Sequence, residues 1–206
     1  QHQRPCRTND HGRPHERGHD RSQDPQLRRS EARHEEDRER GERYYGEALA
    51  RSSRLTEWER LRLGMNLQGF RGQLDSSTVL AGVIAQRFPS VEAWYDYGTG
   101  LMQLARDREA ILALNQALEI DSTFTNAWIN LATVYVAMGR FADAVAAYQG
   151  ADRTDSMALY ANFINHEYGS ALIANGQTAE AQRVFRRMSA SRALGNRQFG
   201  FRSLGY

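Results

Sequence analysis

The first residues with metal-binding chemistry lie near the start of the sequence. Four side chains could supply thiolate and imidazole ligands to a zinc ion: Cys6, His11, His15 and His19. The three histidines recur every four residues and would share one face of a helix. Gly12, Pro14 and Gly18 disfavour that helix, and no apolar residues surround the four side chains to shape a site. We therefore expect neither a metal site nor a cofactor.

A second group with catalytic chemistry lies towards the other end of the chain. His166 stands one helical turn before Ser170, a spacing that would bring a general base towards a hydroxyl nucleophile. No third group is placed to orient the imidazole, and no second His follows at the spacing of a zinc protease. The interpretation that we favour is a His that lines a groove, so we assign no catalytic residue.

The basic residues exclude further enzyme classes. All 27 of them are Arg, and Lys is absent. The chain therefore has no phosphate-loop Lys, no Schiff-base Lys and no kinase ATP-site Lys. The net charge of +2 gives no reason to expect nucleic-acid binding, and no run approaches the roughly 18 apolar residues of a membrane span. We predict that the protein is not an enzyme.

The elements that would position functional residues begin after a sharp change in composition. Residues 1–43 of the 206-residue chain hold three apolar side chains against eleven Arg, ten Asp or Glu and five His. Such a segment cannot bury enough apolar surface to offset the entropy of ordering, so we expect it to be disordered. Two explanations stay open: the segment is a genuine linker, or it is an out-of-frame translation of GC-rich coding DNA.

The rest of the chain has the apolar period of helices and no alternation typical of a strand. A first helix is expected to end near residues 52–53. Thr56 and Glu59 then have the spacing of a capping box at the start of the next helix. A further helix is expected from about Asp75 to just before Pro89. The predicted fold class is all-α.

An internal repeat of 34 residues organises these helices. The matching pairs, each 34 residues apart, are Trp94 with Trp128, Ala110 with Ala144, Leu114 with Tyr148, Ala117 with Ala151, Asp121 with Asp155 and Ser122 with Ser156. A third copy follows after a three-residue insertion. Each unit would consist of two short antiparallel helices, whose apolar faces are covered by the neighbouring units.

Small residues recur where helices must approach closely. Gly98, Ala132 and Gly169 stand where the first helix of each unit would meet the second. Gly139 and Gly176 fit the turn between the two helices, because a glycine adopts the left-handed conformation that ends a helix at low cost. The sequence therefore predicts both the contact and the turn of each helix pair.

The pattern resembles the tetratricopeptide repeat, whose 34-residue signature holds Trp, Leu-Gly, Tyr, Ala, Phe and a terminal Pro. Residues 91–124, 125–158 and 162–195 are near full-length copies, with Ser122 and Ser156 in the Pro position. The resemblance implies a tetratricopeptide-repeat α-solenoid, in which antiparallel helix pairs form a right-handed superhelix.

The flanks of these copies are less regular. Residues 58–90 resemble a degenerate copy, in which Met65 and Ser77 occupy positions that small residues usually hold. A further unit would begin at about residue 198, and we expect the chain to break off within its first helix. The whole array would then span residues 44–206.

The resemblance also implies a binding surface, because tetratricopeptide arrays hold an extended peptide or a partner helix on the inner face of each first helix. Carried over by position, that face comprises Glu92, Tyr95, Asp96, Thr99, Met102, Gln103, Asn126, Ile129, Asn130, Thr133, Val136, Phe163, His166, Glu167, Ser170 and Ile173. Asn130 falls where the family often uses an Asn to grip a ligand's backbone amide. The apolar anchors would be Tyr95, Met102, Ile129, Phe163 and Ile173.

Charge narrows the expected partner. None of these inner-face positions holds Arg, whereas Glu92, Asp96 and Glu167 are acidic. The face should repel an acidic tail and accept a neutral or basic, partly apolar segment. We therefore predict a non-catalytic scaffold that binds a protein or peptide partner and no nucleic acid.

Two alternatives stay open. Residues 55–63 resemble the start of arrays appended to bacterial serine/threonine kinases and transcriptional activators. The chain would then be the regulatory tail of a signalling protein whose catalytic or DNA-binding domain lies upstream. The second alternative is self-association through an uncovered apolar face near Phe199, Phe201 and Leu204. The lack of a visible signal peptide favours a cytoplasmic location.

Overall fold

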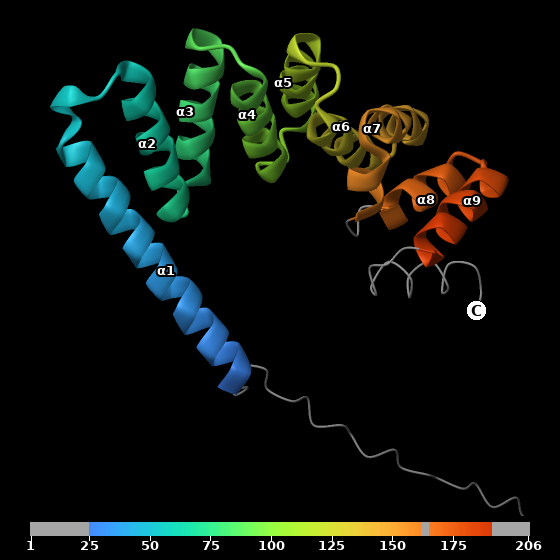
Figure 1. Ribbon diagram of the computed structural model, residues 1–206, viewed down its shortest axis with the longest axis horizontal. Helices are drawn as coiled ribbons and strands as arrows, with labels where there is room; N and C mark the ends of the chain where they lie inside the picture. Colours follow the sequence, from blue (N-terminus) through green and yellow to red (C-terminus); the bar gives the residue numbers. More distant parts are fainter. Residues whose placement is uncertain (1–24, 162–164, 191–206) are drawn as a thin grey trace, which may run out of the picture.

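The computed structural model describes residues 25–161 and 165–190, and this part of the chain is helical, with no strand (Figure 1). The helices are α1 (Pro25–Ala50), α2 (Glu57–Phe70), α3 (Leu74–Arg87), α4 (Val91–Gln103), α5 (Asp107–Ile120), α6 (Thr125–Ala137), α7 (Phe141–Ala161), α8 (Asn165–Ala174) and α9 (Thr178–Ser189). A short 3-10 turn, η2 (Ser52–Arg54), joins α1 to α2. The expected all-α class is confirmed.

Helices α2 to α9 form four antiparallel pairs that follow one another along the molecule (Figure 1). The first helices of the pairs are α2, α4, α6 and α8, and the second helices are α3, α5, α7 and α9. Helix α4 contacts α6, and α6 contacts α8, in addition to the contacts within each pair. Because the first helices approach one another in this way, their layer is the inner side of the array.

The starts and ends of the helices follow local signals in the sequence. Thr56 Oγ1 accepts a hydrogen bond from the backbone N–H of Glu59, and Glu59 Oε2 accepts one from the backbone N–H of Thr56, so the predicted capping box is present at α2. Ser90 caps α4 in the same manner, since its hydroxyl accepts from the N–H of Ala93 at 3.1 Å. Helix α3 ends before Pro89, as predicted.

The 34-residue repeat is visible in the backbone. Asp121 ends α5 in an extended conformation (φ −141°, ψ 99°). Asp155, 34 residues later, adopts nearly the same conformation (φ −151°, ψ 90°) inside α7. Helix α7 therefore consists of two helical segments that meet at Asp155, and the repeat ends at the same backbone position in both units.

Each helix pair is joined by a turn that contains one residue in the left-handed region. Gly139 and Gly176 hold φ angles of +70° and +78°, as predicted, and Gly72 holds +71°. In the pair α4–α5 the same position is Ala105, with φ +55°. The left-handed conformation costs an L-residue about 1–2 kcal/mol, so this turn is strained where the other three are not.

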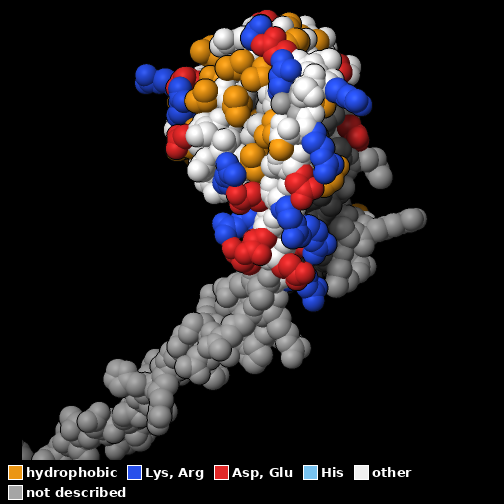
Figure 2. Space-filling model, turned by 90° about the vertical axis from the view of Figure 1, so that its left-hand side faces the viewer, with side chains coloured by type: hydrophobic (Ala, Val, Ile, Leu, Met, Phe, Trp, Pro, Cys, Tyr) orange, Lys and Arg blue, Asp and Glu red, His pale blue; other side chains and the backbone are white. Residues whose placement is uncertain are grey.

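The segment expected to be disordered is helical in part. Residues 25–43 form the first turns of α1, and residues 1–24 lie outside the described part of the chain. Two kinds of contact explain the helix. Arg40 lies 3.6 Å from Glu36, four residues before it, and 3.3 Å from Asp37, three residues before it, and ion pairs at these spacings support a helix. Charged side chains of both signs are interleaved on the end of the molecule that carries α1 (Figure 2).

The C-terminal turns of α1 also dock on α2. The ring of Tyr45 packs on that of Phe70 with centroids 5.3 Å apart, and Arg71 Nε donates to Glu42 Oε1 at 2.8 Å. Residues 25–43 have few apolar side chains, but α2 gives the helix a fixed end. The prediction of disorder was therefore wrong for residues 25–43.

Small residues let the two helices of each pair approach. A Cβ added at Gly98 would lie 2.8 Å from Leu114, so this niche is filled completely. In the first pair Gly64 faces Leu80, and a Cβ added there would lie 3.5 Å from the Leu80 side chain, an ordinary van der Waals contact. The sequence register placed Met65 in this niche. Gly64 occupies it instead, because α2 is one residue longer than α4.

Candidate functional site

Two contacts on the inner layer join the first helices of neighbouring units, in each case between side chains 34 residues apart in sequence. Arg62 Nη1 of α2 donates to Asp96 Oδ2 of α4 at 2.8 Å. Thr133 Oγ1 of α6 donates to Glu167 Oε2 of α8 at 3.3 Å. We refer to these contacts as the α2–α4 junction and the α6–α8 junction. Each junction therefore places one carboxylate on the inner layer.

A further contact joins α4 to α6. Asn130 Nδ2 donates to Thr99 Oγ1 at 3.2 Å, so the Asn expected to grip a ligand's backbone already touches the neighbouring unit. Its carbonyl oxygen accepts no hydrogen bond from the described residues. The side chain therefore keeps an acceptor for a ligand's N–H while its orientation is fixed from the other end.

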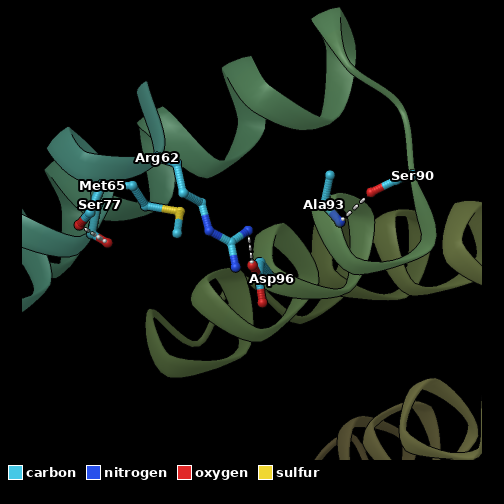
Figure 3. A network of polar contacts seen from close by, with 6 residues as sticks. All are labelled: Arg62, Met65, Ser77, Ser90, Ala93 and Asp96. Carbon is cyan, nitrogen blue, oxygen red and sulfur yellow. Dashed lines mark hydrogen bonds and ion pairs between the residues drawn. The ribbon is translucent and has the colours of Figure 1, made fainter. Parts of the chain in front are cut away.

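A cavity of about 470 Å³ opens between α2, α3 and α4, and we call it the α2–α4 cavity. Its walls are Arg62, Met65, Asn66, Gly69, Gly72, Leu74, Ser77, Thr78, Ala81, Asp96, Thr99, Gly100 and Gln103. Figure 3 shows Arg62 extending from α2 towards Asp96, with Met65 beside it. Ser77 Oγ donates to the carbonyl oxygen of Met65 at 3.0 Å, which holds α3 against α2 along one wall.

The carboxylate of Asp96 sits in a mixed electrostatic environment. Its pKa is raised because burial disfavours the charged form, and the nearby charge of Glu92 adds to this effect. Arg62 acts in the opposite direction through its charge and its hydrogen bond, without cancelling the cost of burial. The Asp96 side chain is 32% exposed, so the carboxylate is accessible from the inner side.

The carboxylate of the α6–α8 junction has neutral partners. Besides Thr133, Tyr148 of α7 donates its hydroxyl to Glu167 Oε2 at 2.9 Å. Tyr148 is fully buried, and burial is the main reason that its pKa is raised, with the charge of Glu167 adding to it. This phenol therefore stays protonated and keeps its donor aimed at Glu167.

The structure brings three of the predicted inner-face residues together in the α2–α4 cavity, namely Asp96, Thr99 and Gln103. On the same layer, Glu92, Asn126 and Ser170 are exposed, and His166 is half-buried. These side chains give the inner layer polar groups outside the cavity as well.

The predicted apolar anchors have different surroundings. Ile173 is 52% exposed and available to a partner. Tyr95 is half-buried, with its ring packed edge-on against Phe124 at 5.2 Å, and Met102 is half-buried against the core. Val136, predicted to belong to the same face, is half-buried as well.

One anchor was wrongly assigned. Ile129 is only 5% exposed and belongs to the main core cluster. Its counterpart one repeat earlier on α4, Tyr95, is half-buried, so the two positions differ in exposure although the repeat aligns them. The fifth anchor, Phe163, lies outside the described residues.

Sequence reasoning missed the side of the cavity formed by α2 and α3. Arg62, Asn66 and Ser77 all line it. The signal was present, because Arg62 lies 34 residues before Asp96, one repeat earlier on the same face. The predicted inner face began only at residue 92, so it carried no Arg, whereas the observed face has Arg62 beside its first carboxylate.

A second cavity, of about 560 Å³, lies on the α5 side of α4. Trp94 and Tyr97 line it from α4, and α5 contributes Leu112, which is 68% exposed, together with Glu109 and Glu119. We call it the outer cavity. None of the predicted inner-face residues lines it. The outer cavity is therefore the alternative location for a bound segment.

Other candidate chemistry is limited in the part of the chain that the structure describes. No group of three or more His, Cys, Asp or Glu is placed there to hold a metal ion. Cys6, His11, His15 and His19 lie outside that part. None of its helices is long and apolar enough to cross a membrane.

The fold and the family comparison agree. The structure defines the chain as an α-solenoid of antiparallel helix pairs, and residues 101–166 match the sequence model of the family described as tetratricopeptide repeat. The chain thus has the fold of a tetratricopeptide-repeat α-solenoid, and its central part matches that family in sequence.

Solved structures share the same architecture at low sequence identity. The chain is 20% identical to the crystal structure of MamA, with a TM-score of 0.60 over 80% of this chain and 90% of that one. A thermophilic tetratricopeptide-repeat protein of Thermus thermophilus is 16% identical, with a TM-score of 0.59 over 78% of this chain and 87% of that one. YrrB is 14% identical, with a TM-score of 0.62 over 83% and 85%. No curated protein matches the chain in sequence.

Proposed function

We propose that the inner layer binds a segment of a protein partner, either an extended peptide or a helix. The observation that carries the proposal is the α2–α4 cavity, because it lies where the repeat register places the binding residues Asp96, Thr99 and Gln103. One solved neighbour, YrrB, is described as having an unusual peptide-binding site. The mechanism would be surface complementarity along the inner layer, without a catalytic step.

The chemistry of the layer favours a neutral to basic segment with apolar residues. Glu92, Asp96 and Glu167 supply three carboxylates to this layer, and Arg62 pairs with one of them, Asp96. Ile173, and the exposed parts of Tyr95 and Met102, would receive apolar side chains. An acidic segment would meet like charges and would be disfavoured.

The proposal is tested with an array of short synthetic peptides of random sequence, probed with the labelled full chain. We expect the bound peptides to be enriched in Arg or Lys together with apolar residues, and depleted in Asp and Glu. Enrichment of acidic peptides, or binding that ignores composition, would contradict the proposed partner.

The location of binding is tested with a matched pair of substitutions. Ser170→Arg places a long cation on the inner layer, and Ser76→Arg places the same side chain at an exposed position of α3 away from the α2–α4 cavity. We expect the first to weaken binding of the selected basic peptides by roughly ten-fold, because like charges across an interface are costly, and the second to leave it unchanged. Equal effects would place binding outside the inner layer.

A further inference from the structure

Two carboxylates and one guanidinium lie in or beside the wall of the α2–α4 cavity. Asp96 and Glu92 lie one helical turn apart on α4, and Arg62 of α2 donates a hydrogen bond to Asp96. The two carboxylates influence each other, as the effect of Glu92 on the pKa of Asp96 indicates. The guanidinium of Arg62 therefore pairs with Asp96, while the charge of Glu92, which does not line the cavity, adds to the negative charge around Asp96.

The hydrogen bonding of Asp96 is also incomplete. Arg62 reaches only Oδ2, through a single N–H, and Oδ1 accepts no hydrogen bond from the described residues. A partly buried carboxylate is stabilised by charge-assisted hydrogen bonds to both of its oxygens. The cavity thus contains a carboxylate oxygen that is ready to accept a further donor.

The remaining walls suit a long side chain that ends in several N–H groups. Met65, Leu74 and Ala81 give an apolar lining on the α2 and α3 sides. The amides of Asn66 and Gln103 line the same cavity, and neither makes a hydrogen bond to a described residue. An aliphatic stem can lie against the apolar part while its polar end meets the carboxylate and the amides.

We propose that the α2–α4 cavity receives an arginine side chain of the bound segment, with its guanidinium on Oδ1 of Asp96. The proposal rests on the proposed function and names the residue that the inner layer selects. Guanidinium carries five N–H donors in a planar arrangement, so it can bond to the carboxylate and to a neutral acceptor together. A carboxylate in this place would face Asp96 and Glu92, and a neutral amide would leave their charge unmatched.

Arg62 has a defined part in this arrangement. Its guanidinium donates a hydrogen bond to Oδ2 of Asp96, so it competes with the guanidinium of the ligand for the negative charge of Asp96. Replacing it with a neutral side chain should therefore strengthen binding of a guanidinium, whereas an Arg62 that itself held the ligand would weaken binding when removed. Because the two roles of Arg62 predict opposite changes in affinity, Arg62→Gln distinguishes between them.

The experiment uses the nitrogen-15-labelled full chain and two small probes, N-acetylarginine amide and N-acetylglutamine amide. Amide shifts of Thr99, Gly100 and Gly72 report occupancy of the cavity. We expect the arginine probe to bind about five-fold or more tightly than the glutamine probe, as a charge-assisted hydrogen bond is roughly twice as strong as a neutral one. Asp96→Asn should remove the preference, and Arg62→Gln should increase it.

A matched control shows whether the effect belongs to the cavity. Asp143→Asn removes another carboxylate that pairs with an Arg, here Arg140 at 2.7 Å, from an exposed turn of α7. It should leave the preference for the arginine probe intact. Equal affinity for the two probes, equal loss in Asp96→Asn and Asp143→Asn, or weaker binding by Arg62→Gln would each overturn the proposal.

The two proposals can fail separately. Array peptides that bind the inner layer without any preference for the arginine probe would overturn the arginine pocket and leave the proposed function standing. Binding of the arginine probe in the cavity without any array peptide would support the pocket and overturn the proposed scaffold function.

Discussion

The two junctions of the inner layer hold their carboxylates in opposite ways. At the α2–α4 junction, Asp96 pairs with a charged Arg62 beside an open cavity of about 470 Å³. At the α6–α8 junction, Glu167 accepts hydrogen bonds from the neutral hydroxyls of Tyr148 and Thr133. The same repeat therefore yields a junction with an accessible charge and a junction whose carboxylate is tied into the core.

The difference follows from the side chains that the second helices provide. Helix α7 contributes Tyr148, which is fully buried and fills the space behind Glu167 while donating to it. Helix α3 contributes the small side chains of Ser77, Thr78 and Ala81 to the corresponding space behind Asp96. A large residue closes one junction, and small residues leave the other open for a ligand.

The largest expected effect is the loss of stability when a large side chain is removed from each junction. Tyr148→Ala should lower the free energy of unfolding by about 4 kcal/mol, because it empties a fully buried site and removes the donor to Glu167. Met65→Ala, at the edge of the open junction, should cost about 2 kcal/mol, since its neighbours already border a cavity. Urea unfolding of both variants measures the difference, and equal losses would contradict the distinction.

The hydroxyl of Tyr148 gives a smaller and pH-dependent effect. Tyr148→Phe keeps the ring and should lower the free energy of unfolding by about 1.5–3 kcal/mol at neutral pH, the range for a hydrogen bond to a charged group. The pKa of Tyr148 is raised in the folded protein, so its contribution is complete below about pH 10 and is lost as the pH rises beyond the value of an unfolded Tyr.

The stability gap between wild type and Tyr148→Phe should therefore narrow above about pH 10. Unfolding in urea at neutral and alkaline pH measures it. A gap that widens on alkalinisation would show that the phenol is not held protonated by Glu167.

The helices of the α4–α5 pair pack more tightly at their glycine contact than the helices of the α2–α3 pair. Gly98→Ala should lower the free energy of unfolding by about 1–2 kcal/mol, because the new Cβ would lie 2.8 Å from a fully buried Leu114. Gly64→Ala, with 3.5 Å to Leu80, should raise it by up to about 1 kcal/mol through better helix propensity. Thermal unfolding of the two variants measures these changes in stability. Two changes of the same sign would contradict the difference in packing.

The smallest expected effect concerns the ion pair itself. Both side chains of the Arg62–Asp96 pair are about one-third exposed, so Arg62→Gln should lower the free energy of unfolding by only about 0.5 kcal/mol at neutral pH. The pKa of Asp96 is already raised and would rise further, so the loss should shrink as the pH falls and Asp96 becomes protonated. A loss that grows on acidification would mean that Asp96 is not the partner affected.

Much of the fold could be predicted from the sequence because its signals are local or periodic. The capping box of Thr56 and Glu59, the stop at Pro89 and the glycines of two turns each depend on a few neighbouring residues. The repeat depends only on a fixed separation, which the matching backbones of Asp121 and Asp155 confirm.

The errors arose where a position depends on the surroundings of its helix. Composition alone made residues 25–43 look disordered, whereas ion pairs and docking on α2 support a helix. One extra residue in α2 moved the small position from Met65 to Gly64. Ile129 is buried whereas Tyr95, at the same place in the preceding repeat, is half-buried, so the place in the repeat does not fix the exposure.

The candidate site was predicted only in part, because its residues were taken from the repeat register. The repeat register identified Asp96, Thr99 and Gln103, which line one side of the α2–α4 cavity. It stopped at the first regular copy, so it omitted Arg62 and Asn66 from the degenerate copy before it. A cavity between two units is lined by residues from both units. The degenerate copy matches the repeat signature less well than the regular copies, so its share of the lining was not predicted.

The central claim is that a partner segment binds on the inner layer rather than in the outer cavity. The most direct test is photo-crosslinking of an array-selected peptide to full chains that carry benzoylphenylalanine at Gln103, in the α2–α4 cavity, or at Glu119, in the outer cavity. Both positions are exposed, so the label itself is equally tolerated. We predict a crosslink from position 103 that an excess of unlabelled peptide removes, and none from position 119. A crosslink from position 119 alone would contradict the account.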